Sequence, residues 1–362
     1  MTALPPHPRI LIVALRRLGD VLLVTPLIRS LKRAWPDAMI DVLVFRGTEG
    51  ILAGNPDLAG VLTLPERANA GESFALLRKL WCVYDLSIST QSGDRPTFFA
   101  WAAGRCSVGF VDPAGVMSAL KRITLDKPVP VVAGLHRVAE VLRLAEALGI
   151  SAVAAVVAPG PKPAKRTDRR YAVIHAAPMF RYKRWTAEGW RGLAAALAAR
   201  GLAVVATSGP GEEERRYLDQ VWESASNVQR LDPLSWGELT HLIAGAQLYA
   251  GPDTSVTHLS AATGTPTIAL YGPTDPRLWG PWPAQGLAEP WETAGTVQNR
   301  GNVWLIQNPP SCPWSILPCQ QEGCERHIKS YSRCLDELAV SQVLSAVDAA
   351  LAGAVARPGE RG

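Results

Sequence analysis

The sequence lacks the features that mark membrane proteins and nucleic-acid-binding proteins. The apolar run at residues 10–15 is interrupted by Arg16 and Arg17, so it is too short for a membrane span or for the apolar part of a signal peptide. No block of Lys and Arg resembles a nucleic-acid-binding arm. We therefore expect a cytoplasmic protein with no nucleic-acid partner.

The motifs of several familiar sites are also missing. No Cys-x-x-Cys pair occurs, and neither half of the chain opens with G-x-G-x-x-G, which argues against a nicotinamide-dependent oxidoreductase. Four of the six cysteines share a Pro-rich segment whose spacing fits no standard zinc finger: Cys312, Cys319, Cys324 and Cys334. A packed loop or local clip is favoured there, with a zinc site and a disulfide staple as alternatives.

The apolar content of the chain is sufficient for two sizeable cores. Of the 362 residues, 48% are hydrophobic, and this length favours two domains over one. The net charge of +5 is mild and suits either an anionic substrate or an anionic membrane surface.

Predicted strands and helices alternate in both halves of the chain. The first half has strands at residues 9–15, 39–45, 60–64 and 84–89, with helices at 21–35, 73–80 and 136–148. The second has strands at 171–175, 202–207, 247–250 and 266–271, a helix at 187–199, an irregular segment at 281–318 and a closing helix at 341–352. This alternation predicts parallel sheets with ligands at the carboxyl ends of their strands.

The expected organisation is therefore α/β, with two doubly wound, Rossmann-like domains. They span residues 1–160 and 161–340 and are joined by a Pro-rich linker within 151–170. A C-terminal helix and tail at 341–362 follow, and we consider that this helix packs back on the first domain.

The stretch at residues 251–273 carries the most specific signal. Asp253 follows a short apolar strand and offers a carboxylate as a helix N-cap. Small residues after it, among them Thr254 and Ser255, keep the helix slim, so that an anion can approach its free N–H groups. The strand at 266–271 ends in a second turn at the same sheet edge. A phosphate is the expected ligand, and an ordinary well-capped βαβ unit is the alternative.

Four motifs in this order closely resemble glycosyltransferase family 9, the ADP-heptose:lipopolysaccharide heptosyltransferases. They are RRLGDVLLVTP at 16–26, KRW at 183–185, GPGEEER at 209–215 and GPDTSVTHLSAATGTPTIALYGPTDP at 251–276. The resemblance covers nearly the whole chain. It implies a GT-B fold, in which two Rossmann-like domains face a central cleft, the first binding the acceptor and the second the nucleotide-sugar donor.

The resemblance also implies the reaction and its partners. Heptose would pass from ADP-heptose to the inner core of lipopolysaccharide, at the cytoplasmic face of the inner membrane, where peripheral contact with the membrane is expected. No cofactor is expected. A family member that uses another nucleotide sugar or acceptor, and a catalytically silent carbohydrate-binding relative, remain alternatives.

Roles for single residues follow from the same resemblance. Asp20 would deprotonate the acceptor hydroxyl, and Lys183 would offset charge on the departing diphosphate. A helix N-cap and a solvated basic loop are the respective alternatives. The implied donor-binding residues are Lys183, Glu212, Asp253, Thr254, Ser255 and His258. For His258 the alternative is a core histidine, and for Glu212 a solvated helix start.

Charge considerations complete the expected mechanism. Arg16 and Arg17 are candidates for contacts with acceptor phosphates or anionic lipid, although solubility is an equally ordinary use of surface arginine. The sequence has no Asp-x-Asp motif for a divalent cation, so we expect no metal, with lysine and a helix N-terminus supplying positive charge. A single in-line displacement predicts inversion, with Asp20 opposite the nucleotide.

Overall fold

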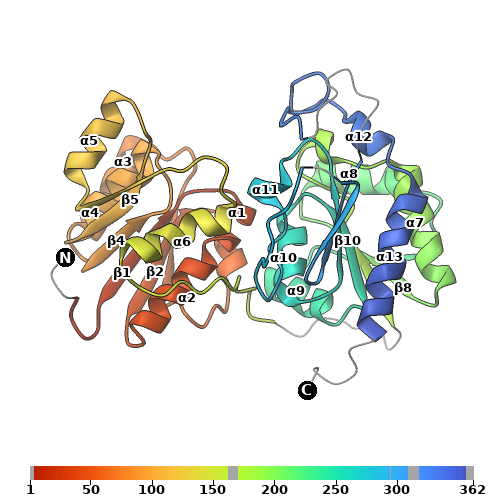
Figure 1. Cartoon of the computed structure of the whole chain (residues 1–362), viewed down its shortest axis with the longest axis horizontal. Coiled ribbons are helices and arrows are strands. Elements are labelled where there is room, and N and C mark those ends of the chain that lie inside the picture. The colour runs from red at the N-terminus through yellow and green to blue at the C-terminus, as the bar shows by residue number, and fades with distance from the viewer. Residues whose placement is uncertain (1–3, 162–169, 294, 309–317, 356–362) are drawn as a thin grey trace. The chain divides into compact units, whose positions relative to one another are not determined.

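The computed structural model describes residues 4–161, 170–293, 295–308 and 318–355 (Figure 1). The chain divides into two compact units, Met1–Gly160 and Pro161–Gly362. Each unit has its own sheet of mostly parallel strands covered by helices, so the α/β alternation predicted for both halves is confirmed. The boundary falls inside the segment 151–170, part of which lies outside the described residues.

The first unit is a six-stranded parallel sheet in the order β3-β2-β1-β4-β5-β6. Its strands are β1 (Arg9–Ala14), β2 (Met39–Phe45), β3 (Gly60–Leu64), β4 (Leu86–Ser89), β5 (Ser107–Val111) and β6 (Lys127–Pro130). Its helices are α1 (Leu18–Leu22), α2 (Thr25–Ala34), η1 (Glu49–Leu52), α3 (Ala70–Leu80), α4 (Asp94–Ala103), α5 (Val116–Thr124) and α6 (Arg137–Ala147). The strand order reverses between β1 and β4, where such folds bind ligands.

The first helix differs from its prediction over residues 21–35. It begins earlier, at Leu18, and is interrupted after Leu22, so that α1 and α2 are separate. Pro26 has no N–H to donate to the carbonyl of Leu22, and the hydroxyl of Thr25 donates to that carbonyl instead, at 2.7 Å. Asp20 consequently lies within a short helix and not before a long one.

The second unit is a seven-stranded sheet in the order β12-β13-β11-β10-β7-β8-β9, in which only the β12–β13 pair is antiparallel. Its strands are β7 (Tyr171–Ile174), β8 (Ala203–Ala206), β9 (Val228–Arg230), β10 (Leu248–Pro252), β11 (Thr267–Tyr271), β12 (Val297–Arg300) and β13 (Val303–Gln307). Its helices are η2 (Arg181–Lys183), α7 (Ala187–Ala199), α8 (Glu212–Val221), α9 (Trp236–Ala244), α10 (Ser255–Thr263), α11 (Pro276–Trp279), α12 (Arg333–Asp336) and α13 (Val340–Val355). The order reverses between β7 and β10.

The hairpin of β12 and β13 corrects the irregular structure predicted for 281–318. Gly301 has φ +56°, the left-handed conformation that a tight turn between two strands requires. Asn302 next to it donates to the carbonyls of Ala261 and Thr265, which holds the turn against α10. Residues 309–317 of the same segment lie outside the described residues.

The C-terminal helix α13 is buried within the second unit. Its side chains Val343, Ala346 and Val347 belong to the core that also contains Ile268 of β11. Helix α13 thus covers the sheet of its own unit, beside α7, and packing of this helix on the first domain stays a prediction.

No helix in the described ranges is long and apolar enough to cross a membrane.

Candidate functional site

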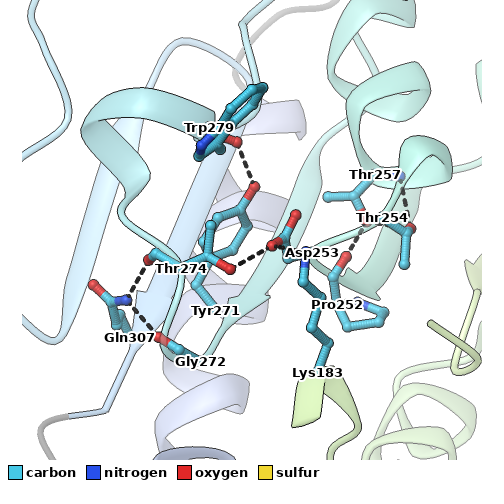
Figure 2. A network of polar contacts seen from close by, with 10 residues as sticks. All are labelled: Lys183, Pro252, Asp253, Thr254, Thr257, Tyr271, Gly272, Thr274, Trp279 and Gln307. Atoms are coloured by element: carbon cyan, nitrogen blue, oxygen red, sulfur yellow. Dashed lines mark hydrogen bonds and ion pairs between the residues drawn. The ribbon is translucent and has the colours of Figure 1, made fainter. Parts of the chain in front are cut away.

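The two loops at the strand reversal of the second unit bring Lys183 and Asp253 together. Lys183 lies in η2, after β7, and Asp253 follows the last residue of β10. Because β7 and β10 are parallel neighbours, both loops leave the same edge of the sheet. The Nζ atom of Lys183 lies 2.5 Å from Oδ2 of Asp253 (Figure 2).

The Asp253 carboxylate is buried and anchored on two sides. Its side chain is 7% exposed, whereas that of Lys183 is 19% exposed, so the lysine is the member nearer to solvent. The hydroxyl of Thr274 donates to the same carboxylate oxygen at 2.7 Å. Burial alone raises the pKa of Asp253, but Lys183, and then His258 and Thr274, lower it below the usual value. Asp253 is therefore an anion that holds the ammonium group of Lys183 in place.

The N-cap of α10 is Thr254, which corrects the prediction that Asp253 caps this helix. The Oγ1 atom of Thr254 accepts the N–H of Thr257. A carboxylate one residue earlier is drawn instead to Lys183, because a buried charge is stabilised more by an opposite charge than by a single N–H group. The hydroxyl of Thr257 donates to the carbonyl of Pro252, which binds the first turn to the strand before it (Figure 2).

The neighbouring loop after β11 is fixed by hydrogen bonds from buried side chains. The amide of Gln307 donates to the carbonyls of Gly272 and Thr274, at 2.6 and 2.9 Å. The hydroxyl of Tyr271 donates to the carbonyl of Trp279 at 2.8 Å. Thr274 is thereby held where it reaches Asp253. Sequence reasoning did not single out Thr274, although its position directly after a buried strand and a Gly-Pro turn was the available signal.

Ser255 and His258 occupy the first turns of α10. Ser255 is the first residue of the helix, so its N–H group is not needed within the helix. His258 lies one turn after Thr254, is 7% exposed, and acts on the pKa of Asp253. The burial of His258 agrees with the alternative of a core histidine, whereas its proximity to Asp253 agrees with the predicted role in donor binding.

Glu212 is placed away from the interior of the loops. Its carboxylate is 73% exposed and pairs with Arg216 one turn along α8, as the alternative of a solvated helix start implied. The third glutamate of the run, Glu214, folds back and accepts the N–H of Gly209 at 2.5 Å. Burial raises the pKa of Glu214. Glu214 is therefore the glutamate of this run that folds back toward the end of β8. The sequence did not indicate which of the three glutamates would do so.

Arg184 has a different environment from Lys183 beside it. Its guanidinium carbon lies 4.1 Å from the centre of the Tyr217 ring. A cavity of about 580 Å³ opens at this point and is lined by Arg181, Arg184, Trp185, Tyr217, Gln220, Tyr331 and Asp336. Of these two adjacent residues, Arg184 therefore lines the cavity, whereas Lys183 contacts Asp253.

Trp185 anchors the loop that carries both basic residues. It is buried, packs edge to face against Trp190, and donates its indole N–H to the carbonyl of Leu338. A Cβ atom on Gly189 would collide with the Trp185 ring, so glycine is needed for this close packing. The Lys183 ammonium is consequently carried by a loop with a fixed base.

His175 is buried at the carboxyl end of β7. Its Nδ1 atom lies 3.1 Å from the hydroxyl of Thr207, which follows β8. Burial lowers the pKa of His175 to about 4, so the ring is neutral at physiological pH. Sequence reasoning used this histidine only as the end of a strand.

In the first unit, Asp20 lies in the first turn of α1, after β1. The N-cap position is Arg17, so the alternative role of Asp20 as N-cap is not what the structure shows. One carboxylate oxygen, Oδ1, is buried without a hydrogen-bond partner among the described residues. A buried acceptor without a donor is costly, and such sites are commonly completed by a ligand or water. Arg16 and Arg17 before it are exposed.

Three of the four clustered cysteines can be described. Cys319, Cys324 and Cys334 form no disulfide with one another, the sulfur of Cys324 accepts the N–H of Arg333, and Cys312 lies outside the described residues. Burial, together with the two neighbouring thiols, raises the pKa of Cys334 to about 12. In the described part of the chain no group of three or more His, Cys, Asp or Glu side chains is arranged to hold a metal ion.

Comparison with known proteins identifies the family. The sequence profile of glycosyltransferase family 9 (heptosyltransferase) matches residues 74–288. The chain is 30% identical over 285 residues to lipopolysaccharide heptosyltransferase 3 of Escherichia coli, covering 73% of this chain and 83% of that one. The chain belongs to glycosyltransferase family 9. To lipopolysaccharide heptosyltransferase 1 of Pseudomonas aeruginosa it is 28% identical over 287 residues, covering 75% and 81% of the two chains.

Solved structures of heptosyltransferases share the fold. E. coli heptosyltransferase WaaC with ADP matches with a TM-score of 0.71 at 22% identity, over 94% of this chain and 99% of that one. E. coli ADP-heptose lps heptosyltransferase II matches with a TM-score of 0.69 at 16% identity, over 95% and 99%. The expected GT-B fold with two parallel Rossmann-like sheets is confirmed.

Proposed function

We propose that this family 9 protein transfers heptose from ADP-heptose to the inner core of lipopolysaccharide, with inversion at the anomeric carbon. The observation that supports this most is the ion pair of Lys183 and Asp253 beside the N-terminus of α10, at the strand reversal of the second unit. That group offers a fixed cation and free N–H groups to an anion. Solved relatives hold ADP or ADP-2-deoxy-2-fluoro heptose.

The donor would bind to the second unit. The N–H groups of Thr254 and Ser255 suit the diphosphate, because the start of a helix favours anions. Lys183 is the more exposed partner of its pair, so its ammonium can face a phosphate while Asp253 keeps it in place. As ADP leaves, this cation and these dipoles stabilise the charge that develops on the diphosphate. Glu212 and His258 are further donor contacts in the proposal. His258 would reach the donor from α10, and Glu212 from the exposed start of α8.

The acceptor would bind to the first unit, where Asp20 is the general base. The buried oxygen of Asp20 accepts the proton of the acceptor hydroxyl, and the hydroxyl oxygen forms a bond to the anomeric carbon of the heptose. The bond from that carbon to the diphosphate oxygen breaks, and its electron pair leaves with ADP. Attack from the face opposite ADP inverts the anomeric configuration. Arg16 and Arg17 are exposed and would meet phosphates of the acceptor or of the membrane that contains it.

Asp20→Asn tests the assignment of the base. The amide cannot accept the proton, so ADP release from ADP-heptose in the presence of a truncated core acceptor should fall by about 10²–10⁴. Binding of ADP-heptose should be unchanged, because the donor contacts lie in the second unit. Asp37→Asn is the matched control, because that carboxylate is 70% exposed. Asp37 precedes β2, which is parallel to β1, so it lies at the sheet edge opposite to the one where α1 begins.

Two outcomes would overturn parts of this proposal. Loss of donor binding in Asp20→Asn would show that the residue does not act as a base alone. A thermal shift with UDP or GDP that exceeds the shift with ADP would favour the alternative of another nucleotide sugar.

A further inference from the structure

Large apolar side chains are exposed mainly in one part of the first unit. Of the fourteen such side chains in the described ranges, eight lie between residues 74 and 123, on or next to α3, α4 and α5. Apolar side chains that are scattered singly need no explanation, whereas a concentration of them marks an interaction surface. The three helices lie together at one end of this unit (Figure 1).

Four aromatic side chains form the first half of this surface. Phe74 on α3 is 71% exposed and Trp81, directly after α3, is 55% exposed. Trp81 packs edge to face against Trp101 of α4, at 5.9 Å between ring centres, and Phe98 stacks on Trp101 at 5.7 Å. Phe98 and Trp101 are 49% and 40% exposed. The rings therefore support one another while their outer faces remain in solvent.

Helix α5 forms the second half, with its polar side buried and its apolar side exposed. Ser118 and Lys121 are buried, whereas Val116 and Ile123 are 87% and 80% exposed. Met117 and Leu120 are also exposed, at 47% and 46%. An ordinary surface helix has the opposite arrangement, because burial of the apolar stripe is what stabilises it.

An ion pair between a buried lysine and an exposed aspartate joins the two halves and explains the orientation of α5. The Nζ atom of Lys121 lies 2.6 Å from Oδ1 of Asp94 in the first turn of α4, and it also donates to the carbonyl of Ser92. Phe98 lies one turn after Asp94 on the same face of α4. With Lys121 turned inward, Leu120 and Ile123 are directed outward. We call the aromatic and helical halves together the α3–α5 surface.

Positive charge borders this surface, and two nearby acids, Asp94 and Glu72, are engaged in other contacts. Arg78 and Lys79 lie in the last turn of α3, just before Trp81, and Arg122 lies in the last turn of α5, between Leu120 and Ile123. Asp94 is paired with Lys121, and Glu72 belongs to the capping box at the other end of α3.

We propose that the α3–α5 surface docks onto an anionic lipid bilayer. Helices that expose aromatic and aliphatic side chains beside basic residues are typical of segments that lie in a membrane interface. Two copies of this chain joined through the same face would bring their cations together, which favours lipid over self-association. The choice of lipid also rests on the proposed function, since lipopolysaccharide precursors are membrane lipids, but vesicle binding is tested without any transfer reaction.

Binding to vesicles tests the proposal. The full chain should sediment with vesicles of phosphatidylcholine and phosphatidylglycerol, and less with phosphatidylcholine alone, and salt should weaken the binding. Leu120→Glu combined with Ile123→Glu should weaken it at least about tenfold, since it removes two inserted side chains and adds negative charge. Ile328→Glu, at a position that is 45% exposed in the second unit, is the matched control and should bind like the wild type.

Insertion of the aromatic half can be followed separately. Brominated acyl chains should quench tryptophan fluorescence, and Trp81→Phe combined with Trp101→Phe should remove most of that quenching although ten of the twelve tryptophans remain. Circular dichroism and the melting temperature verify that each variant is folded.

Several results would overturn the proposal. They are an absence of vesicle binding, equal loss in Ile328→Glu, quenching that persists without Trp81 and Trp101, or a concentration-dependent dimer that the α5 variant abolishes. Transfer to a lipid-free core oligosaccharide should be unaffected by the α5 variant. If vesicle binding follows the prediction and no heptose transfer occurs, the proposed function fails while the docking surface remains.

Discussion

Lys183→Met is expected to destabilise the second unit because it leaves the Asp253 carboxylate buried beside an uncharged side chain. Removing one partner of a buried ion pair costs about 3–5 kcal/mol of unfolding free energy. The cost should lie at the lower end, since Thr274 still donates to the carboxylate and the 19% exposure of Lys183 allows solvent to screen the pair. A loss of about 3 kcal/mol lowers the melting temperature of a unit of this size by about 6–12 °C.

The pH dependence of this loss is the sharper signature. In the wild type, the lowered pKa of Asp253 contributes stability that is present above the unfolded value of about 4 and is lost as pH falls through the folded pKa. In the variant, burial becomes the dominant influence and raises this pKa above the unfolded value. Its folded state then binds the proton more tightly, so this contribution decreases as pH rises from about 4 through the raised pKa. The difference between the two proteins should therefore grow toward neutral pH.

Denaturant unfolding, followed by tryptophan fluorescence between about pH 4 and 7, measures both quantities. Lys329→Met removes an exposed lysine of the same unit and should change stability by less than about 0.5 kcal/mol. Lys183→Met combined with Asp253→Asn replaces both charges and should recover most of the loss. If Lys183→Met changed stability no more than Lys329→Met at every pH, the Lys183–Asp253 pair would not be a buried ion pair.

Three further predictions concern the same unit. Thr254→Ala should cost about 1 kcal/mol of unfolding free energy because it removes the N-cap of α10, while Thr254→Ser should keep the cap and the stability. Denaturant unfolding of both variants measures the difference. Because burial lowers the pKa of His175 to about 4, the wild type should lose up to about 3 kcal/mol as pH falls from about 6.5 to about 4, and His175→Gln should lose less; an NMR titration of the ring checks the pKa directly. Gly251→Ala should cost about 1–3 kcal/mol in thermal unfolding, since its Cβ would press on the Tyr249 hydroxyl, whereas Gly353→Ala meets no atom within 4 Å and should be neutral or stabilising.

Much of the fold could be predicted because buried parallel strands leave continuous apolar runs. The predicted strand at 39–45 coincides with β2, and the closing helix at 341–352 lies within α13. No element was assigned between residues 90 and 135, although α4, β5, α5 and β6 lie there. Helix α5 was missed although Val116, Leu120 and Ile123 recur at helical spacing. What the sequence does not show is that this apolar side faces solvent, because that orientation depends on the contact of Lys121 with Asp94 of another helix.

The candidate site was partly predictable for a similar reason. The motif at 251–276 located the loop and helix correctly, because small and polar residues directly after a short apolar strand are typical of the start of a helix. Asp253 was nevertheless expected as the N-cap, since the competing partner, Lys183, comes from a loop distant in the sequence. The inward fold of Glu214 could not be predicted, because it depends on a contact with Gly209 that only the fold creates.

Product analysis is the most direct test of the central claim that this chain is a heptosyltransferase. Purified protein would be incubated with ADP-heptose and a lipopolysaccharide core truncated before its heptoses, and the acceptor would be examined by mass spectrometry and NMR. We predict an acceptor heavier by one heptose, with an anomeric configuration opposite to that of the donor, and one ADP released for each transfer. Recovery of intact ADP-heptose with every core acceptor tried, or a product that retains the donor configuration, would contradict it.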